Sequence, residues 1–316
     1  MGFGHSHTHD HHGPGQAGAG RARLAIACGI TIGIVLAQFL GAWLTGSLAL
    51  LTDAVHSLTD SIGLLVALTA ASLMFRAATT TRTWGWRRVE ILAGFLQAAL
   101  LLGIGIYALI EGVQRLGLFG SGHSPDIAPE LLLIFGAIGL AGNIASLAVL
   151  ARGRRENFNM RAAFLEVAAD ALGSLGVIIA AVVLWTTGWA QADAVAALLI
   201  ACLIIPRAAR LLQETSRVLL DFTPAGLDLE EVRRHMLALE HVEEVHDLHA
   251  SMIATGLPVL SAHVVVDEAC FTTGCAPQKL AELRACVAEH FDIAVEHSTF
   301  QLETRSIADQ ETHVHS

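Results

Sequence analysis

Two aspartates and a histidine recur at helical spacing inside a stretch that is apolar enough to cross a bilayer. Within residues 51–60, Asp53, His56 and Asp60 would project within about 60° of one another on an α-helix. Carboxylates and imidazole are ligands of divalent metal ions. Ionisable groups at this depth are costly unless a cation or protons compensate their charge, so the segment predicts a functional site.

A second apolar segment carries the same pattern about a hundred residues later. Glu166 and Asp170 stand four residues apart, so they share one face of a helix. Two such helices would bring His56, Asp60, Glu166 and Asp170 together as the four ligands of a tetrahedral metal site. For Asp53 alone, a packing hydrogen bond to a neighbouring helix remains an equal alternative.

The composition is that of an integral membrane protein with a soluble part attached. Of the 316 residues, 53% are hydrophobic and 15% are charged, and the mean hydropathy is +0.57. From residue 215 onward there are 17 acidic and 6 basic residues, so the C-terminal part is strongly acidic. This charge argues against nucleic acid and against docking on anionic lipid.

Apolar runs of spanning length predict a membrane-embedded all-α bundle of six transmembrane helices. They cover residues 24–44, 47–74, 89–113, 131–150, 162–186 and 192–212. Arginines crowd the connections between the second and third and between the fourth and fifth segments, whereas residues 45–46, 117–130 and 187–191 of the alternate connections have no Lys or Arg. Because positive charge collects in cytoplasmic loops, both termini are expected to face the cytoplasm.

Beyond the last apolar run the pattern changes to that of a small soluble domain. Helical and alternating segments follow in the order α-β-β-α-β, which predicts a C-terminal cytoplasmic α+β domain resembling a ferredoxin-like half. The predicted domains are a disordered His-rich tail (1–20), a transport domain (21–214), a cytoplasmic metal-binding and dimerisation domain (215–306) and a disordered tail (307–316).

The five cysteines form no CxxC pair, and their number is odd. We therefore expect no disulfide scaffold, and a reducing compartment fits. The histidines between His5 and His12 alternate with polar residues and would hold zinc or copper loosely, unless the tail is an idle polar extension.

Several separate stretches resemble one known family. They are residues 46–60 with the HxxxD pattern of His56 and Asp60, residues 83–92, residues 159–164 with 170–174, and two stretches of the soluble part, 245–249 and 297–303. On these residues the chain, from about residue 24 to 303, is similar to the cation diffusion facilitators of the zinc-exporter type.

The resemblance implies a homodimer in the cell inner membrane that exports divalent metal from the cytoplasm in exchange for protons, by alternating access. It places the transport site between the second and fifth spans, where His56, Asp60 and Asp170 match the family's ligands. Glu166 stands where zinc-type members usually have histidine. Carboxylate oxygens are harder ligands than imidazole, so manganese or iron(II) becomes an alternative to zinc, cadmium or cobalt.

A second metal site is predicted in the soluble domain. His246, His249, His263, His297 and Glu303 lie on predicted strands, where strand pairing would bring several of them together. By resemblance, the chosen ligands are His246, His263 and His297, with Glu303. A metal role for Cys270 and Cys275 is a weaker alternative. The connection between the second and third spans has no histidine or carboxylate within residues 72–88, so no site is expected there.

Other classes of protein fit the sequence less well. The chain lacks the HExxH string of a metalloprotease and the GxxxxGK[ST] loop of an ATPase, so neither an enzyme nor an organic cofactor is expected. A passive channel would line a continuous pore with polar rings, but the charges here converge at one depth. A membrane-anchored metal sensor is the remaining alternative from another class.

Overall fold

A computed structural model describes residues 14–73, 78–117, 127–151, 158–289, 291 and 293–310. Side chains within residues 14–25, 63–73 and 158–163 are not described. The chain divides into two compact units, one formed by residues 1–65 and 97–209 and the other by residues 66–96 and 210–316. We call them the helical unit and the C-terminal unit.

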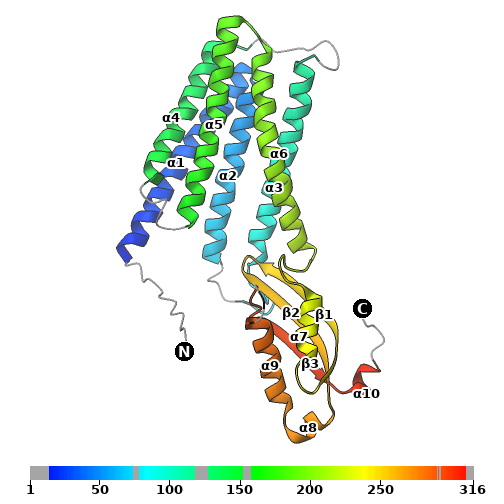
Figure 1. Cartoon of the computed structure of the whole chain (residues 1–316). Coiled ribbons are helices and arrows are strands. Elements are labelled where there is room, and N and C mark those ends of the chain that lie inside the picture. Colours follow the sequence, from blue (N-terminus) through cyan, green and yellow to red (C-terminus); the bar gives the residue numbers. More distant parts are fainter. Residues whose placement is uncertain are drawn as a thin grey trace, which may run out of the picture. The chain divides into compact units, whose positions relative to one another are not determined.

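Long apolar helices dominate the first two-thirds of the chain (Figure 1). They are α1 (Pro14–Thr45), α2 (Leu48–Leu73), α3 (Arg88–Arg115), α4 (Pro129–Ala151), α5 (Phe158–Thr187) and α6 (Gln191–Leu219). Each predicted apolar segment falls on one of them. Among the described residues, five of these helices, all but α2, are long and apolar enough to cross a membrane. The chain is therefore a multi-pass membrane protein.

Helix α1 begins earlier than the sequence pattern predicts. It starts at Pro14, so residues 14–20, expected to be disordered, are helical. Proline suits the first turn of a helix because its fixed φ is already helical and its missing N–H would have no partner there. At the other end, α10 (Arg305–Ala308) occupies part of the expected C-terminal tail. The N-terminal histidines and residues 311–316 lie outside the described residues.

Within the helical unit, small residues let helices approach closely. Helix α4 lies beside both α1 and α5. At Gly139 an added Cβ would lie 3.0 Å from Gln38 Nε2 on α1 and 3.0 Å from Ser174 Oγ on α5, so a larger residue would push all three helices apart.

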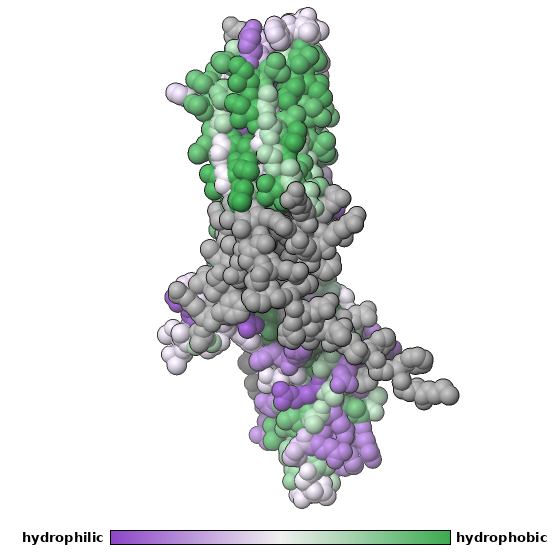
Figure 2. Space-filling model, turned by 90° about the vertical axis from the view of Figure 1, so that its left-hand side faces the viewer, coloured by the Kyte–Doolittle hydropathy of each residue, from purple (hydrophilic) through white to green (hydrophobic). Residues whose placement is uncertain are grey.

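Large apolar side chains point outward from this unit. Trp43, Leu36, Leu172 and Leu203 are each at least two-thirds exposed, and Figure 2 shows a broad hydrophobic surface over the helices on the face that it draws. This is the expected surface of helices that lie in lipid.

The C-terminal unit contains a three-stranded sheet with helices packed on it. Its elements are α7 (Leu229–Leu237), β1 (Val242–Ala254), β2 (Leu257–Val266), α8 (Ala269–Thr273), α9 (Ala276–Glu289) and β3 (His297–Glu303). Strands β1 and β2 are antiparallel, and β3 joins the other edge of β2 in parallel after the α9 crossover. The predicted order of helices and strands is confirmed, with the short helices α8 and α10 added.

Helices α7 and α9 bury one face of this sheet. Their side chains Val232, Met236 and Leu283 have no exposed surface and share a core with alternate residues of β2, such as Val264. The alternation leaves the odd-numbered residues of β2 and β3 on the opposite face. His263 and Glu303 lie on that second face.

The cysteines, for which no disulfide scaffold was expected, form one local disulfide among the described residues. Cys270 and Cys275 form a disulfide across α8, with their Cα atoms 4.8 Å apart. Gly274 has a φ of 80° and turns the chain back at the end of α8, which brings the two thiols together. Because the two sulfur atoms are bonded to each other, Cys270 and Cys275 do not serve as the metal ligands that were the weaker alternative.

Candidate metal sites

Helices α2 and α5 bring three of the four predicted transport-site residues together. His56 and Asp60 lie one turn apart on α2, and Asp170 lies on α5. The three offer ligand atoms that all lie within 4.8 Å of one another. His56 Nε2 is 3.8 Å from an oxygen of Asp60 and 3.7 Å from Oδ1 of Asp170. This spacing is compatible with one small ion between them, because each metal–ligand bond is about 2 Å long.

These three side chains are buried, and several of their polar atoms lack a hydrogen-bond partner. They are 8%, 6% and 3% exposed. Within the described part of the chain, both oxygens of Asp60, Oδ1 of Asp170 and Nδ1 of His56 have no hydrogen-bond partner. Buried polar atoms are nearly always paired, and a buried carboxylate without a partner is costly. The cluster is therefore suited to bind a cation or protons.

Glu166, the fourth predicted residue, lies at the edge of this cluster. Its side chain is 33% exposed and accepts a 3.1 Å hydrogen bond from Arg207 on α6. The other guanidinium nitrogen of Arg207 lies 3.7 Å from Asp60. Arg207 lies near the end of the apolar run of residues 192–212, and the sequence pattern did not single it out. Its proximity to one carboxylate of α2 and one of α5 has no signal in the sequence.

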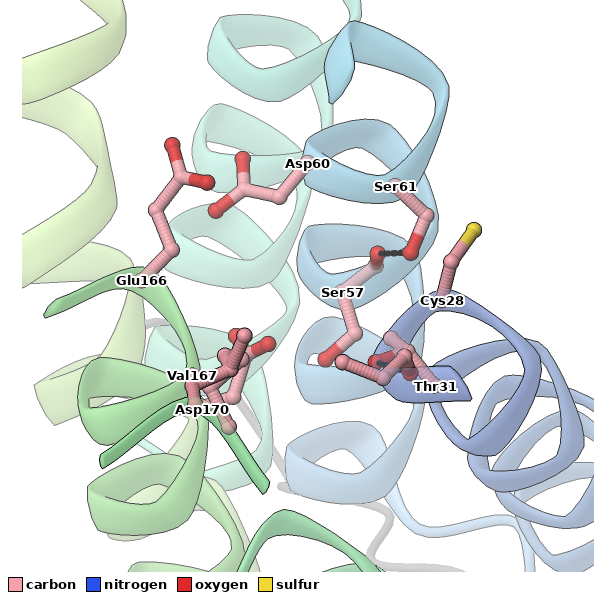
Figure 3. A pocket seen from close by; sticks show the side chains of 10 residues that line it. Cys28, Thr31, Ser57, Asp60, Ser61, Glu166, Val167 and Asp170 are labelled. Atoms are coloured by element: carbon pink, nitrogen blue, oxygen red, sulfur yellow. Dashed lines mark hydrogen bonds between the residues drawn. The ribbon is translucent and has the colours of Figure 1, made fainter. Parts of the chain in front are cut away.

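A small cavity opens beside these residues. Its volume is about 40 Å³, and Asp60, Glu166 and Asp170 line it together with residues of α1 such as Cys28 and Thr31. Figure 3 shows the carboxylates of Asp60 and Glu166 facing one another, with Asp170 about a turn further along α5. A space of this size holds about one water molecule or a bare ion.

Asp53 has a different environment from His56 and Asp60, which lie on the same face of α2. Its Oδ2 accepts hydrogen bonds from Gln38 on α1 at 2.6 Å and from Ser174 on α5 at 3.1 Å. Asn143 on α4 in turn donates to Ser174. Asp53 thus joins four helices one turn away from His56, which is the interhelical role that the sequence left open.

Another buried carboxylate, that of Asp193, caps a helix. Asp193 at the start of α6 accepts hydrogen bonds from the Ser47 hydroxyl and from the backbone N–H groups of Leu48 and Ala49. It also lies 3.6 Å from Arg115, which donates to the carbonyl of Gly46. Asp193 therefore satisfies two of the free N–H groups at the start of α2 from another helix. The sequence analysis did not identify this residue.

The C-terminal unit holds the second cluster, formed by His246, His263 and Glu303. His246 pairs with His263 across β1 and β2, and their ring centroids are 5.3 Å apart. His246 Nε2 lies 2.6 Å from Oε1 of Glu303, and His263 Nδ1 lies 3.8 Å from its Oε2. Glu303 is 1% exposed. Two imidazoles and a carboxylate this close can bind a divalent metal ion.

His297 is not part of this cluster. It pairs with Val259, four residues from His263 along β2, and four residues of strand span about 13 Å. Its ring instead packs edge-on against Trp84, with the centroids 4.8 Å apart. His249 is also apart, since it lies beyond a β-bulge and contacts Asp247 at 3.0 Å. The prediction grouped these histidines because it could not fix the strand register.

The fold and these clusters define a class: a multi-pass membrane protein with one set of metal-ligand side chains among its helices and another in a soluble unit. The model of the cation efflux transmembrane domain matches residues 24–220. The chain belongs to this family, the cation diffusion facilitators, and is similar to its zinc-exporting members.

Relatives match nearly the whole chain. The metal cation efflux system protein CzcD of Cupriavidus metallidurans is 38% identical over 278 residues, which cover 88% of this chain and 85% of CzcD. The zinc transporter ZitB of Escherichia coli is 36% identical over 280 residues, 88% of this chain and 85% of ZitB. The cadmium, cobalt and zinc/H(+)-K(+) antiporter of Bacillus subtilis is 34% identical over 276 residues, 87% and 86% of the two chains.

Proposed function

We propose that the protein exports divalent metal ions, zinc foremost, in exchange for protons by alternating access. The observation that carries this proposal is the buried group of His56, Asp60 and Asp170, whose ligand atoms converge between membrane helices. A site of this charge must hold either protons or a metal ion, so the two compete for the same oxygen atoms. Such competition is the chemical basis of an antiporter.

The names of the relatives support the choice of ions. The protein from Bacillus subtilis is named for cadmium, cobalt, zinc and an exchange against protons and potassium, and that from Escherichia coli for zinc. An imidazole with carboxylates suits zinc and admits cadmium and cobalt. We therefore assign the same ions to this chain, with manganese and iron(II) as the alternative that the extra carboxylate of Glu166 favours.

We assign four ligands to the transported ion. His56, Asp60 and Asp170 form the core of the site, and Glu166 completes a tetrahedral set when it leaves Arg207. Glu166 lines the same cavity as Asp60 and Asp170, which supports this role.

The proposed architecture has six spans, with α2 as the one that joins the five apolar helices. Its 26 residues are sufficient to cross a bilayer. We place the transport domain at residues 21–214 and the ferredoxin-like cytoplasmic domain at 215–306, with both termini in the cytoplasm and the protein in the inner membrane as a homodimer. The arginine-rich connections support this orientation.

The cluster of His246, His263 and Glu303 is proposed as a cytoplasmic metal site. The soluble domain is acidic, so two copies in a dimer would repel one another until metal ions reduce the charge. Binding there would adjust transport according to the cytoplasmic metal concentration.

The test is zinc uptake into reconstituted vesicles with the internal pH recorded. Asp170→Ala should abolish uptake and the accompanying proton movement, because it removes a central ligand. Glu214→Ala, which removes an exposed carboxylate of α6 outside both clusters, is the matched control and should retain uptake. Normal uptake by Asp170→Ala at equal protein amount would disprove the site. Zinc binding without uptake by the parent protein would identify a metal sensor instead.

A further inference from the structure

A positively charged side chain lies at a site that is built for a metal cation. Arg207 projects from α6 toward the two helices that supply the ligands. One guanidinium nitrogen is 3.7 Å from Asp60 on α2, and the other is 3.1 Å from Glu166 on α5. We call this arrangement the Arg207 bridge.

The Arg207 bridge uses oxygen atoms that the ion also needs. Asp60 belongs to the three-residue ligand cluster, and Glu166 is the proposed fourth ligand. A guanidinium is planar with five donors, always charged, and able to contact two carboxylates at once. An ion that takes Glu166 must therefore break the 3.1 Å hydrogen bond to Arg207, and one that approaches Asp60 meets the positive charge of the guanidinium.

The charge of the cluster favours a competition between Arg207 and the ion. Asp60, Glu166 and Asp170 contribute three negative charges when ionised, and Arg207 contributes one positive charge. While the site is free of metal, the remaining charge is that of two carboxylates, so the guanidinium reduces the cost of the empty cluster. Arg207 thus offsets the charge that Glu166 adds to the cluster.

The exposure of the side chains gives the bridge room to open. Arg207 is 48% exposed and Glu166 33%, whereas Asp60 is 6% exposed. Arg207 lies near the end of the apolar run of residues 192–212, where a long basic side chain can reach the membrane surface with its charged end. An ion pair that only held the helices together would be expected to have both of its side chains buried.

We propose that Arg207 is a tethered competitor of the transported ion. It holds Asp60 and Glu166 while the site is free of metal, moves away when the ion binds, and assists release when it returns. Arg207 is then a positioning and affinity-setting residue, and this inference depends on the transport function proposed above.

The experiment measures the zinc concentration for half-maximal uptake in reconstituted vesicles. Arg207→Gln should lower this concentration about tenfold, because the coupling of a close charge pair is lost. The maximal rate should fall, because the ion is released more slowly. Arg210→Gln is the matched control. Arg210 is exposed on the same helix, three residues on, and has no ion pair among the described residues. This variant should match the parent protein.

A double-mutant cycle separates competition from a structural role. In a Glu166→Gln background the effect of Arg207→Gln should shrink to less than about threefold, because one of its two partners is already neutral. Loss of a helix strut would raise the half-saturating concentration or reduce the amount of folded protein. An unchanged or higher half-saturating concentration in Arg207→Gln would overturn the inference.

Two further variants keep the result decisive. If Arg207→Gln does not fold, Arg207→Lys serves, because an ammonium cannot bridge both carboxylates as a guanidinium does. It should lower the half-saturating concentration by less than Arg207→Gln would, and equality with the parent would overturn the inference. Asp170→Ala reports on the transport site separately. If it abolishes uptake while the Arg207 variants match the parent, only the role of Arg207 is wrong.

Discussion

Gly173→Ala should disrupt the helical unit and transport together. Gly173 lies on α5 one turn beyond Asp170, and a Cβ placed there would meet the carboxylate of Asp53 on α2, with Cγ at 3.2 Å and one oxygen closer still. The carboxylate cannot move aside easily. Its other oxygen is held by Gln38 at 2.6 Å and by Ser174 at 3.1 Å, and both partners are fully buried.

The expected cost follows from these contacts. Overpacking a close helix contact costs about 1–3 kcal/mol, and breaking one buried hydrogen bond to a charged group costs roughly 1.5–3 kcal/mol. Alanine returns about 1 kcal/mol through its higher helix propensity. The net loss is about 1.5–5 kcal/mol of unfolding free energy. Separating α2 from α5 by about 1 Å also displaces His56 from Asp170, which can reduce the transport rate on the order of a hundredfold.

Gly176→Ala is the matched control. It introduces the same change on the same helix one turn further on, and its Cβ would have no atom within 4 Å. Thermal unfolding of the purified proteins in detergent and zinc uptake in vesicles are measured on both variants. Gly173→Ala should be less stable and nearly inactive, and Gly176→Ala should match or exceed the parent protein. If the two variants behave alike, the close approach of α2 and α5 at Asp53 does not determine the site.

Two further outcomes are expected. Asp193→Ala should lower the unfolding free energy by about 2 kcal/mol, because it removes the acceptor of the Leu48 and Ala49 N–H groups at the start of α2; thermal unfolding in detergent measures this, and a loss below about 0.5 kcal/mol would contradict it. The hydrogen bond from Lys279 lowers the pKa of Glu282 in the folded protein. The contribution of Glu282 to folding stability is therefore complete above its unfolded pKa of about 4.3, and it is lost as the pH falls through the lower folded pKa. Glu282→Gln should therefore flatten the decline in stability of the C-terminal unit below about pH 5 in acid titrations followed by circular dichroism. An unchanged slope would show that the pair with Lys279 is irrelevant.

Periodic patterns carried most of the correct predictions. The i, i+4 spacing of His56 and Asp60 fixes their shared face on any helix, and their apolar surroundings fix the helix itself. The alternation along β1 and β2 likewise predicts strands with one buried face. These relations hold within a single element, so the sequence contains them.

Relations between elements were harder to predict. Arg207 follows Pro206 near the end of an apolar run, where an arginine ordinarily marks the cytoplasmic boundary, and only packing brings it to Glu166. The separation of His297 from His263 depends on the register of β3 beside β2. A shift of register along the strands leaves the sequence pattern unchanged but changes every cross-strand neighbour.

The cap at Asp193 has a consequence for how the protein is made. The N–H groups at the start of α2 are satisfied by a residue that follows about 145 positions later. During synthesis, α2 enters the membrane well before α6 exists, and unsatisfied backbone groups are costly in lipid. The first helices therefore complete their assembly only after the last one arrives. A chain that ends before α6 would keep only the local cap from the Ser47 hydroxyl to Leu50 N–H, and the N–H groups of Leu48 and Ala49 would lack the Asp193 carboxylate.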